Sequence, residues 1–153
     1  MNTFRLLVVI TMFFISGCFS TPKYYDYQGK KNLTVESELD NGVSLYLDIH
    51  EVDKECKTHS QGIINTANNP TKLSLKPNKL YYIVVMFGSH GYQSVASIRS
   101  GMLLQTYNNE QHIIKASYID SLYDVKLFAK SIVKDFARKL NLIPLEYCSY
   151  INK

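Results

Sequence analysis

The sequence predicts a mainly β domain of the α+β class: an antiparallel meander, a sandwich or a partly open barrel, followed by one C-terminal amphipathic helix. Two observations predict the strands. Apolar and polar residues alternate in residues 43–50, and short β-branched or aromatic segments recur at regular spacing between turn residues. After Ser121 the apolar spacing changes from two residues to three or four, which predicts the helix. An all-β sandwich is the alternative.

The strands differ in the strength of their signals. Residues 43–50 have the clean alternation of a strand with one solvated face. Residues 80–87 form a continuous apolar run, which is typical of a central strand covered on both faces. Weaker strands are expected at residues 33–37, 62–66, 72–75, 93–99, 102–107 and 112–118. The turns between these segments are predicted at Asn68-Asn69-Pro70, Pro77-Asn78, Gly88-Ser89-His90-Gly91, Ser100-Gly101 and Asn108-Asn109-Glu110.

The C-terminal helix is predicted between residues 122 and 140 and ends near Asn141 and Pro144. Its apolar face consists of Leu122, Val125, Phe128, Ala129, Ile132, Val133, Phe136 and Leu140. Residues 123–127 are also compatible with a strand. Four basic residues at successive i, i+4 positions form a basic ridge on this helix: Lys126, Lys130, Lys134 and Arg138. The ridge is a candidate binding surface for anionic headgroups or an acidic partner, and the alternative is an ordinary solvated face.

The first eighteen residues contain the three parts of an export signal. A weakly basic start with Arg5 precedes the apolar residues 6–15, and small residues follow. The apolar run is shorter than the roughly 20 residues that a spanning helix needs. The tetrad Ile15-Ser16-Gly17-Cys18 resembles the lipobox of bacterial lipoproteins. This resemblance implies that residues 1–17 are removed and that Cys18 carries the lipid. An uncleaved anchor and a plain secretory signal are the alternatives.

The same resemblance implies three parts of the chain. Residues 1–17 are the signal peptide, residues 18–32 are the lipidated N-terminus and tether, and residues 33–153 are one globular domain facing the periplasm. Phe19 follows Cys18 in place of the aspartate that marks inner-membrane retention, so the outer membrane is favoured. Three tyrosines in the tether leave open whether it packs on the domain, lies at the headgroups or meets a partner: Tyr24, Tyr25 and Tyr27.

The cysteine count bears on the compartment as well. Once Cys18 carries lipid, two cysteines remain, Cys56 and Cys148. Export to an oxidising space predicts a disulfide between them, and two buried free thiols are the alternative. A disulfide would dock the end of the chain on the domain.

Charge and motifs exclude several functions. The formal net charge of +4 is too small to indicate nucleic-acid binding. A metal site would need more ligands than His50, Cys56 and His59 offer, and the predicted disulfide would also take Cys56. Ser89 and His90 come without an acidic partner for nucleophilic catalysis. The sequence therefore predicts no catalytic residues, no metal and no cofactor.

These observations predict a non-enzymatic accessory or assembly factor. It would be anchored to the cell envelope by lipid and would bind another envelope component, expected to be a protein, through a sheet edge or the C-terminal helix. The alternative is a lipoprotein that carries a lipid or a peptidoglycan fragment, which the many tyrosines favour.

Overall fold

The computed structural model describes residues 23–66, 69–90, 95–133 and 136–151. Among these residues, strands account for most of the chain, which confirms the mainly β fold. The strands are β1 (Leu33–Leu39), β2 (Val43–Val52), β3 (Thr58–Asn65), β4 (Thr71–Leu73), β5 (Leu80–His90), β6 (Val95–Gln105), β7 (Glu110–Ile119), β8 (Leu122–Ser131) and β9 (Ala137–Leu140). A 3₁₀ turn, η1 (Leu145–Tyr147), and a short helix, α2 (Cys148–Ile151), follow them.

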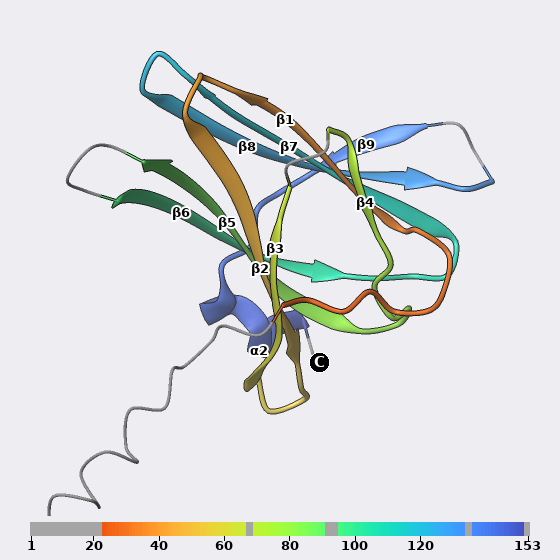
Figure 1. Ribbon diagram of the computed structural model, residues 1–153. Helices are drawn as coiled ribbons and strands as arrows, with labels where there is room; N and C mark the ends of the chain where they lie inside the picture. The colour runs from red at the N-terminus through yellow and green to blue at the C-terminus, as the bar shows by residue number, and fades with distance from the viewer. Residues whose placement is uncertain (1–22, 67–68, 91–94, 134–135, 152–153) are drawn as a thin grey trace, which may run out of the picture.

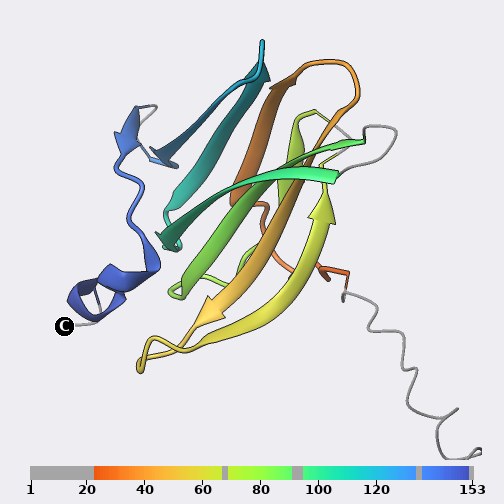
Figure 2. The ribbon, with the colours of Figure 1, turned by 90° about the vertical axis from the view of Figure 1, so that its left-hand side faces the viewer.

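The strands form two sheets that pack face to face as a sandwich (Figure 1 and Figure 2). One sheet has five strands in the order β4-β1-β7-β8-β9, and the other has four in the order β3-β2-β5-β6. Within the described residues the two sheets are not joined into a closed barrel. All neighbouring strands are antiparallel except β1 and β7, which run parallel. This pair departs from the purely antiparallel arrangement that the sequence predicts.

The core lies between the two sheets and follows the period of two in the strands. Strands β2 and β5 contribute alternate residues to this core, namely Leu45, Leu47, Ile49, Ile83, Val85 and Phe87. They meet buried residues of the five-stranded sheet, among them Leu33, Val35, Ile114 and Leu127. Fully burying side chains of this size stabilises the fold by about 1.5–3 kcal/mol each. The predictions of a strand at residues 43–50 and of a central strand at residues 80–87 are confirmed.

A single strand, β6, occupies the region in which the sequence predicts two strands joined by a turn. Ser100-Gly101 is predicted as a turn, but the strand continues through it from Val95 to Gln105. Gly101 has a packing role, because a Cβ there would collide with the Tyr82 side chain on the neighbouring strand β5. The glycine lets the tyrosine ring lie across the sheet, an arrangement known at edge strands.

The predicted helix between residues 122 and 140 is wrong. Strand β8 begins at Leu122 after a two-residue turn in which Asp120 and Ser121 have φ angles of 52° and 65°. Positive φ at both positions is the requirement of a type I′ hairpin turn. The same sequence contains a period-two pattern, in which Val125, Leu127 and Ala129 are buried. Antiparallel pairing with β7 in the same sheet, together with burial of this face in the core, favours this pattern over the helical one.

The C-terminal segment covers the outer face of the four-stranded sheet. Cys148 forms a disulfide with Cys56, with their Cα atoms 5.8 Å apart, as the cysteine count predicts. The Leu103 N–H donates to the Ile143 carbonyl at 2.7 Å, which holds the segment against β6. A second, smaller core lies beneath the segment and includes Val52, Leu80, Leu103 and Cys148. The single helix near the C-terminus is therefore this short α2.

The N-terminal segment packs on the domain from Lys23 onward. The Tyr24 N–H donates to the Ile63 carbonyl at 3.1 Å, and the Tyr24 side chain is buried in the core. At the other end of the segment, Asn32 hydrogen-bonds Leu75 through both its amide nitrogen and its amide oxygen. Of the alternatives left open for the tyrosines of the tether, packing on the domain is what the structure shows for Tyr24, and residues 18–22 lie outside the described residues.

Candidate functional site

The predicted lipid site and the predicted basic ridge have different outcomes. Cys18 and the whole lipobox lie outside the described residues. Lys126 and Lys130 lie on the outer face of the five-stranded sheet, because they alternate with its buried residues. Arg138 lies on the opposite face, where its guanidinium approaches the Glu110 carboxylate at 3.3 Å. Lys134 also lies outside the described residues. The three described residues of the predicted ridge therefore do not lie on one face, and the prediction of a single basic ridge is wrong for them.

The outer face of the five-stranded sheet mixes charges of both signs. The Lys115 ammonium lies 3.0 Å from the Glu36 carboxylate, and the Lys126 ammonium lies 2.5 Å from that of Asp124. The hydrogen bond from Lys126 is the main reason that the pKa of Asp124 is lowered. These pairs are exposed, and exposed ion pairs contribute little to stability. The face is a solvated one with compensated charge.

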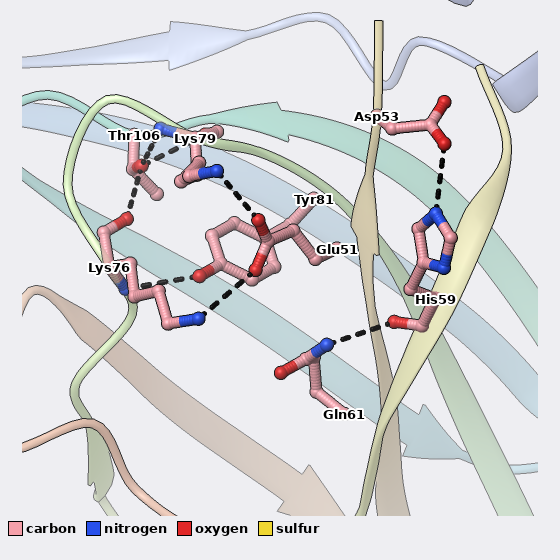
Figure 3. A network of polar contacts seen from close by, with 8 residues as sticks. All are labelled: Glu51, Asp53, His59, Gln61, Lys76, Lys79, Tyr81 and Thr106. Atoms are coloured by element: carbon pink, nitrogen blue, oxygen red, sulfur yellow. Dashed lines mark hydrogen bonds and ion pairs between the residues drawn. The ribbon is translucent and has the colours of Figure 1, made fainter. Parts of the chain in front are cut away.

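Two histidines, His50 and His59, each pair with a carboxylate close to them in the sequence. His50 lies 3.0 Å from Asp48, and His59 lies 2.9 Å from Asp53 (Figure 3). The hydrogen bond with His59 is the main reason that the pKa of Asp53 is lowered. Across the described ranges, no group of three or more histidine, cysteine or carboxylate side chains is placed to hold a metal ion.

The end of the β7–β8 hairpin exposes apolar side chains. We call Ile119, Leu122 and Tyr123 the hairpin end. Leu122 is 76% exposed, and Ile119 and Tyr123 are also exposed. Large apolar side chains gathered at one exposed place commonly mark a binding surface. The hairpin end is therefore a candidate site for a protein partner.

The hairpin end rests on a fixed base. The Asp40 N–H donates to the Tyr118 carbonyl at 2.9 Å, and the Asp120 N–H donates to the Asp40 carboxylate at 2.8 Å. The ring of Phe87, from the other sheet, lies 5.8 Å from the Tyr118 ring and 6.2 Å from the Tyr123 ring. These contacts hold the turn in place while its apolar side chains face solvent.

The hairpin end lies on the far side of the domain from the point where the described chain begins, at Lys23 (Figure 1 and Figure 2). A second exposed apolar group, with Ile132, Val133 and Phe136, flanks residues 134–135, which are outside the described residues. Unlike this second group, the hairpin end lies wholly within the described residues.

A polar network fixes the turn that joins β4 to β5 (Figure 3). The Thr106 hydroxyl is buried and hydrogen-bonds the Lys76 carbonyl at 2.8 Å and the backbone of Lys79 at 2.9 and 3.0 Å. The Glu51 carboxylate lies 3.4 Å from the Lys76 ammonium and 2.8 Å from that of Lys79. The hydrogen bond from Lys79 is the main reason that the pKa of Glu51 is lowered. Tyr81 lies at the centre of this network and also lines a hollow with Tyr24, Tyr25 and Tyr27.

Comparisons with protein-family models, with curated proteins and with solved structures found no match to this chain. No helix in the described part of the chain has the length and hydropathy needed to cross a bilayer. Function must therefore be inferred from the residues themselves.

The hairpin end was missed because its residues fit the predicted helix. One available signal is the pattern Ile119-Asp120-Ser121-Leu122, in which two polar residues separate two apolar ones, as in a two-residue hairpin loop. The hollow was missed because residues 24–27 precede the first predicted strand.

Proposed function

We propose that this chain is a lipid-anchored accessory protein of the bacterial cell envelope that binds another envelope protein through the hairpin end. The lipid is attached to Cys18, and the domain faces the periplasm, with the outer membrane favoured over the inner one. The observation that carries the proposal is the exposed apolar group at Ile119, Leu122 and Tyr123. Its distance from Lys23 suits a protein held at one side and bound at the other.

The chemistry of the hairpin end favours a protein partner over a charged surface. Protein interfaces combine an apolar centre with a polar rim. Here Asp40 and Asp120 lie at the turn beside the apolar side chains, so this part of the rim is acidic, whereas Asp124 is paired with Lys126 on the outer face of the sheet. An acidic rim repels anionic headgroups, and it complements a partner with an apolar patch beside basic side chains.

Site-specific photocrosslinking in the native cells tests the partner. A photoreactive side chain at Leu122 should capture one envelope protein, because apolar contacts at the centre of an interface lie within crosslinking reach. The matched control replaces Lys72, an exposed side chain of β4 that lies away from the hairpin end. The same set of proteins from both positions, or capture at neither, would contradict the proposal.

Cell fractionation tests the anchor. Cys18→Ala should move the protein from the membrane fraction to the soluble fraction, because two or three acyl chains are needed for lasting attachment. Ser20→Ala serves as the control and should leave the protein in the membrane. If the Cys18→Ala protein stays with the membrane, lipid attachment at this residue is wrong.

A further inference from the structure

A hollow of about 400 Å³ opens between the N-terminal segment and the edge of the four-stranded sheet. Its lining includes Tyr24, Tyr25, Tyr27, Gln61, Lys76 and Tyr81. The volume lies within the range of small-molecule sites in proteins. Four tyrosines around one hollow, together with amide and ammonium groups, point to a ligand that has both apolar and hydrogen-bonding surfaces.

Two of the tyrosines form a rigid floor. The buried Tyr24 hydroxyl donates to the Ser74 carbonyl at 2.8 Å, and the buried Tyr81 hydroxyl accepts from the Lys76 N–H at 3.1 Å. Burial raises the pKa of the Tyr24 phenol and raises the pKa of Tyr81 to about 12. Both phenols are therefore neutral at physiological pH, and the floor carries no charge of its own.

The other two tyrosines present free ring surface. Tyr25 is 85% exposed and Tyr27 is 43% exposed. Their segment is held by Ser74, because the Tyr27 N–H donates to the Ser74 carbonyl at 3.2 Å and the Asp26 carboxylate accepts from the Ser74 N–H at 2.7 Å. The Tyr27 ring lies close to Gly29, where an added Cβ would approach within 2.9 Å of the ring. The rings thus stand on a fixed backbone, which lowers the entropy lost on binding.

Polar groups complete the lining. The Gln61 amide nitrogen donates to the His59 carbonyl at 3.2 Å, and the Lys76 ammonium lies 3.4 Å from Glu51. Gln28 adds a second, exposed amide. Figure 3 shows that Gln61 and Lys76 extend on either side of the lower edge of the Tyr81 ring.

We propose that this hollow binds a saccharide built of N-acetylhexosamine units. A pyranose ring has a face of C–H groups that packs on an aromatic ring, and hydroxyls at its rim that need donors and acceptors. The N-acetyl group adds a methyl that suits the tyrosine rings and an amide that suits Gln28 and Gln61. A lipid acyl chain fits less well, because it cannot satisfy the amides and the ammonium that line the hollow.

Nuclear magnetic resonance titration tests the proposal on the full-length chain in detergent, with the N-acetylglucosamine tetramer as probe. Amide resonances of residues 24–29 should shift as the probe saturates the site. Tyr25→Ala and Tyr27→Ala should each weaken binding about two- to twelvefold, because each substitution removes an aromatic face on which a sugar ring packs. Tyr25→Phe keeps the ring and should bind within about twofold of the original chain.

Tyr150→Ala is the matched control, since Tyr150 is 72% exposed and lies on α2, at the C-terminus. Unchanged resonances of residues 24–29 at millimolar probe, or equal binding by the Tyr25→Ala/Tyr27→Ala double variant, would overturn the proposal. Two further titrations identify the source of the saccharide. Soluble peptidoglycan fragments should bind if the glycan strand is the ligand, and lipopolysaccharide micelles should bind if a lipid-linked saccharide is.

Discussion

The two ends of this domain are built differently. At one end lies the C-terminal segment, and there a disulfide, the second small core and the buried Thr106 network hold this segment, the β2–β3 turn and the β4–β5 turn in place. At the other end the β7–β8 hairpin turns back with two residues and leaves Leu122 in solvent. These ties at the first end reinforce the main core, which lies between the two sheets. At the hairpin end Tyr123 still contacts Phe87, whereas Leu122 is 76% exposed, and this exposed side chain is the reason to assign the hairpin end to binding.

The largest expected effect comes from removing the disulfide, at the end of the domain that lies away from the hairpin end. Cys56→Ser/Cys148→Ser opens a loop with a sequence separation of 92 residues. In the chain-entropy model this lowers the free energy of unfolding by about 4–5 kcal/mol. Urea unfolding of the variant measures the loss, and reduction of the original chain provides the control. A loss below about 1 kcal/mol would remove the distinction between the two ends.

The next effect concerns the buried hydroxyl of Thr106. Thr106→Val leaves the Lys79 N–H and the Lys76 carbonyl without their partner, so the free energy of unfolding should fall by about 1–3 kcal/mol. Thr58→Val, on an exposed position of β3, should change it by less than about 0.5 kcal/mol. Equal unfolding midpoints of the two variants in urea would show that the network does not stabilise this end.

A third prediction uses pH. His112 is 2% exposed, and burial lowers its pKa from 6.5 despite the nearby Glu110 carboxylate, while Arg138 lowers it further. The unfolded chain therefore binds the proton more readily, and stability falls as pH decreases below about 6.5. The slope due to this group is at most about 1.4 kcal/mol per pH unit.

Urea unfolding between pH 7.5 and pH 5 checks this slope. His112→Asn should flatten it, whereas His59→Asn, with a 60% exposed histidine side chain, should not. The same slope in His112→Asn and in the original chain would show that the buried histidine does not govern the pH response.

The smallest expected effect lies on the outer face of the five-stranded sheet. Lys126→Glu replaces an exposed charge beside Asp124, so the free energy of unfolding should change by less than about 0.5 kcal/mol. Crosslinking from Leu122 should continue, because this face is separate from the hairpin end. Loss of the captured protein in Lys126→Glu would make the basic face part of the binding surface.

Sequence reasoning predicted the strands that have one unambiguous period. β2 alternates cleanly, and β5 is a continuous apolar run, so both were placed within a few residues. Cys56 and Cys148 are the two cysteines outside the predicted lipobox, and the expectation of export to an oxidising space favoured pairing them over two free thiols; the disulfide is confirmed.

The errors arose where two patterns coincide. The residues of β8 fit a helical and a strand pattern equally, and only pairing with β7 decides between them. Gly101 has the local signature of a turn, although its role is to leave room for Tyr82 from the neighbouring strand. The hairpin end and the position of the hollow depend on such long-range contacts, so the hairpin end was not predicted, and the tyrosines indicated a binding pocket only as an alternative, without its place in the fold.

The most direct test of the central claim measures stability and partner capture in one variant. Leu122→Ser should leave the thermal unfolding midpoint within about 1 °C, because the side chain is already in solvent. It should also abolish the crosslink formed from a photoreactive residue at Ile119. Leu127→Ser, at a buried position of the same strand that faces the core, should lower the midpoint strongly. A lowered midpoint with capture intact in Leu122→Ser would contradict the claim that the hairpin end serves binding and not folding.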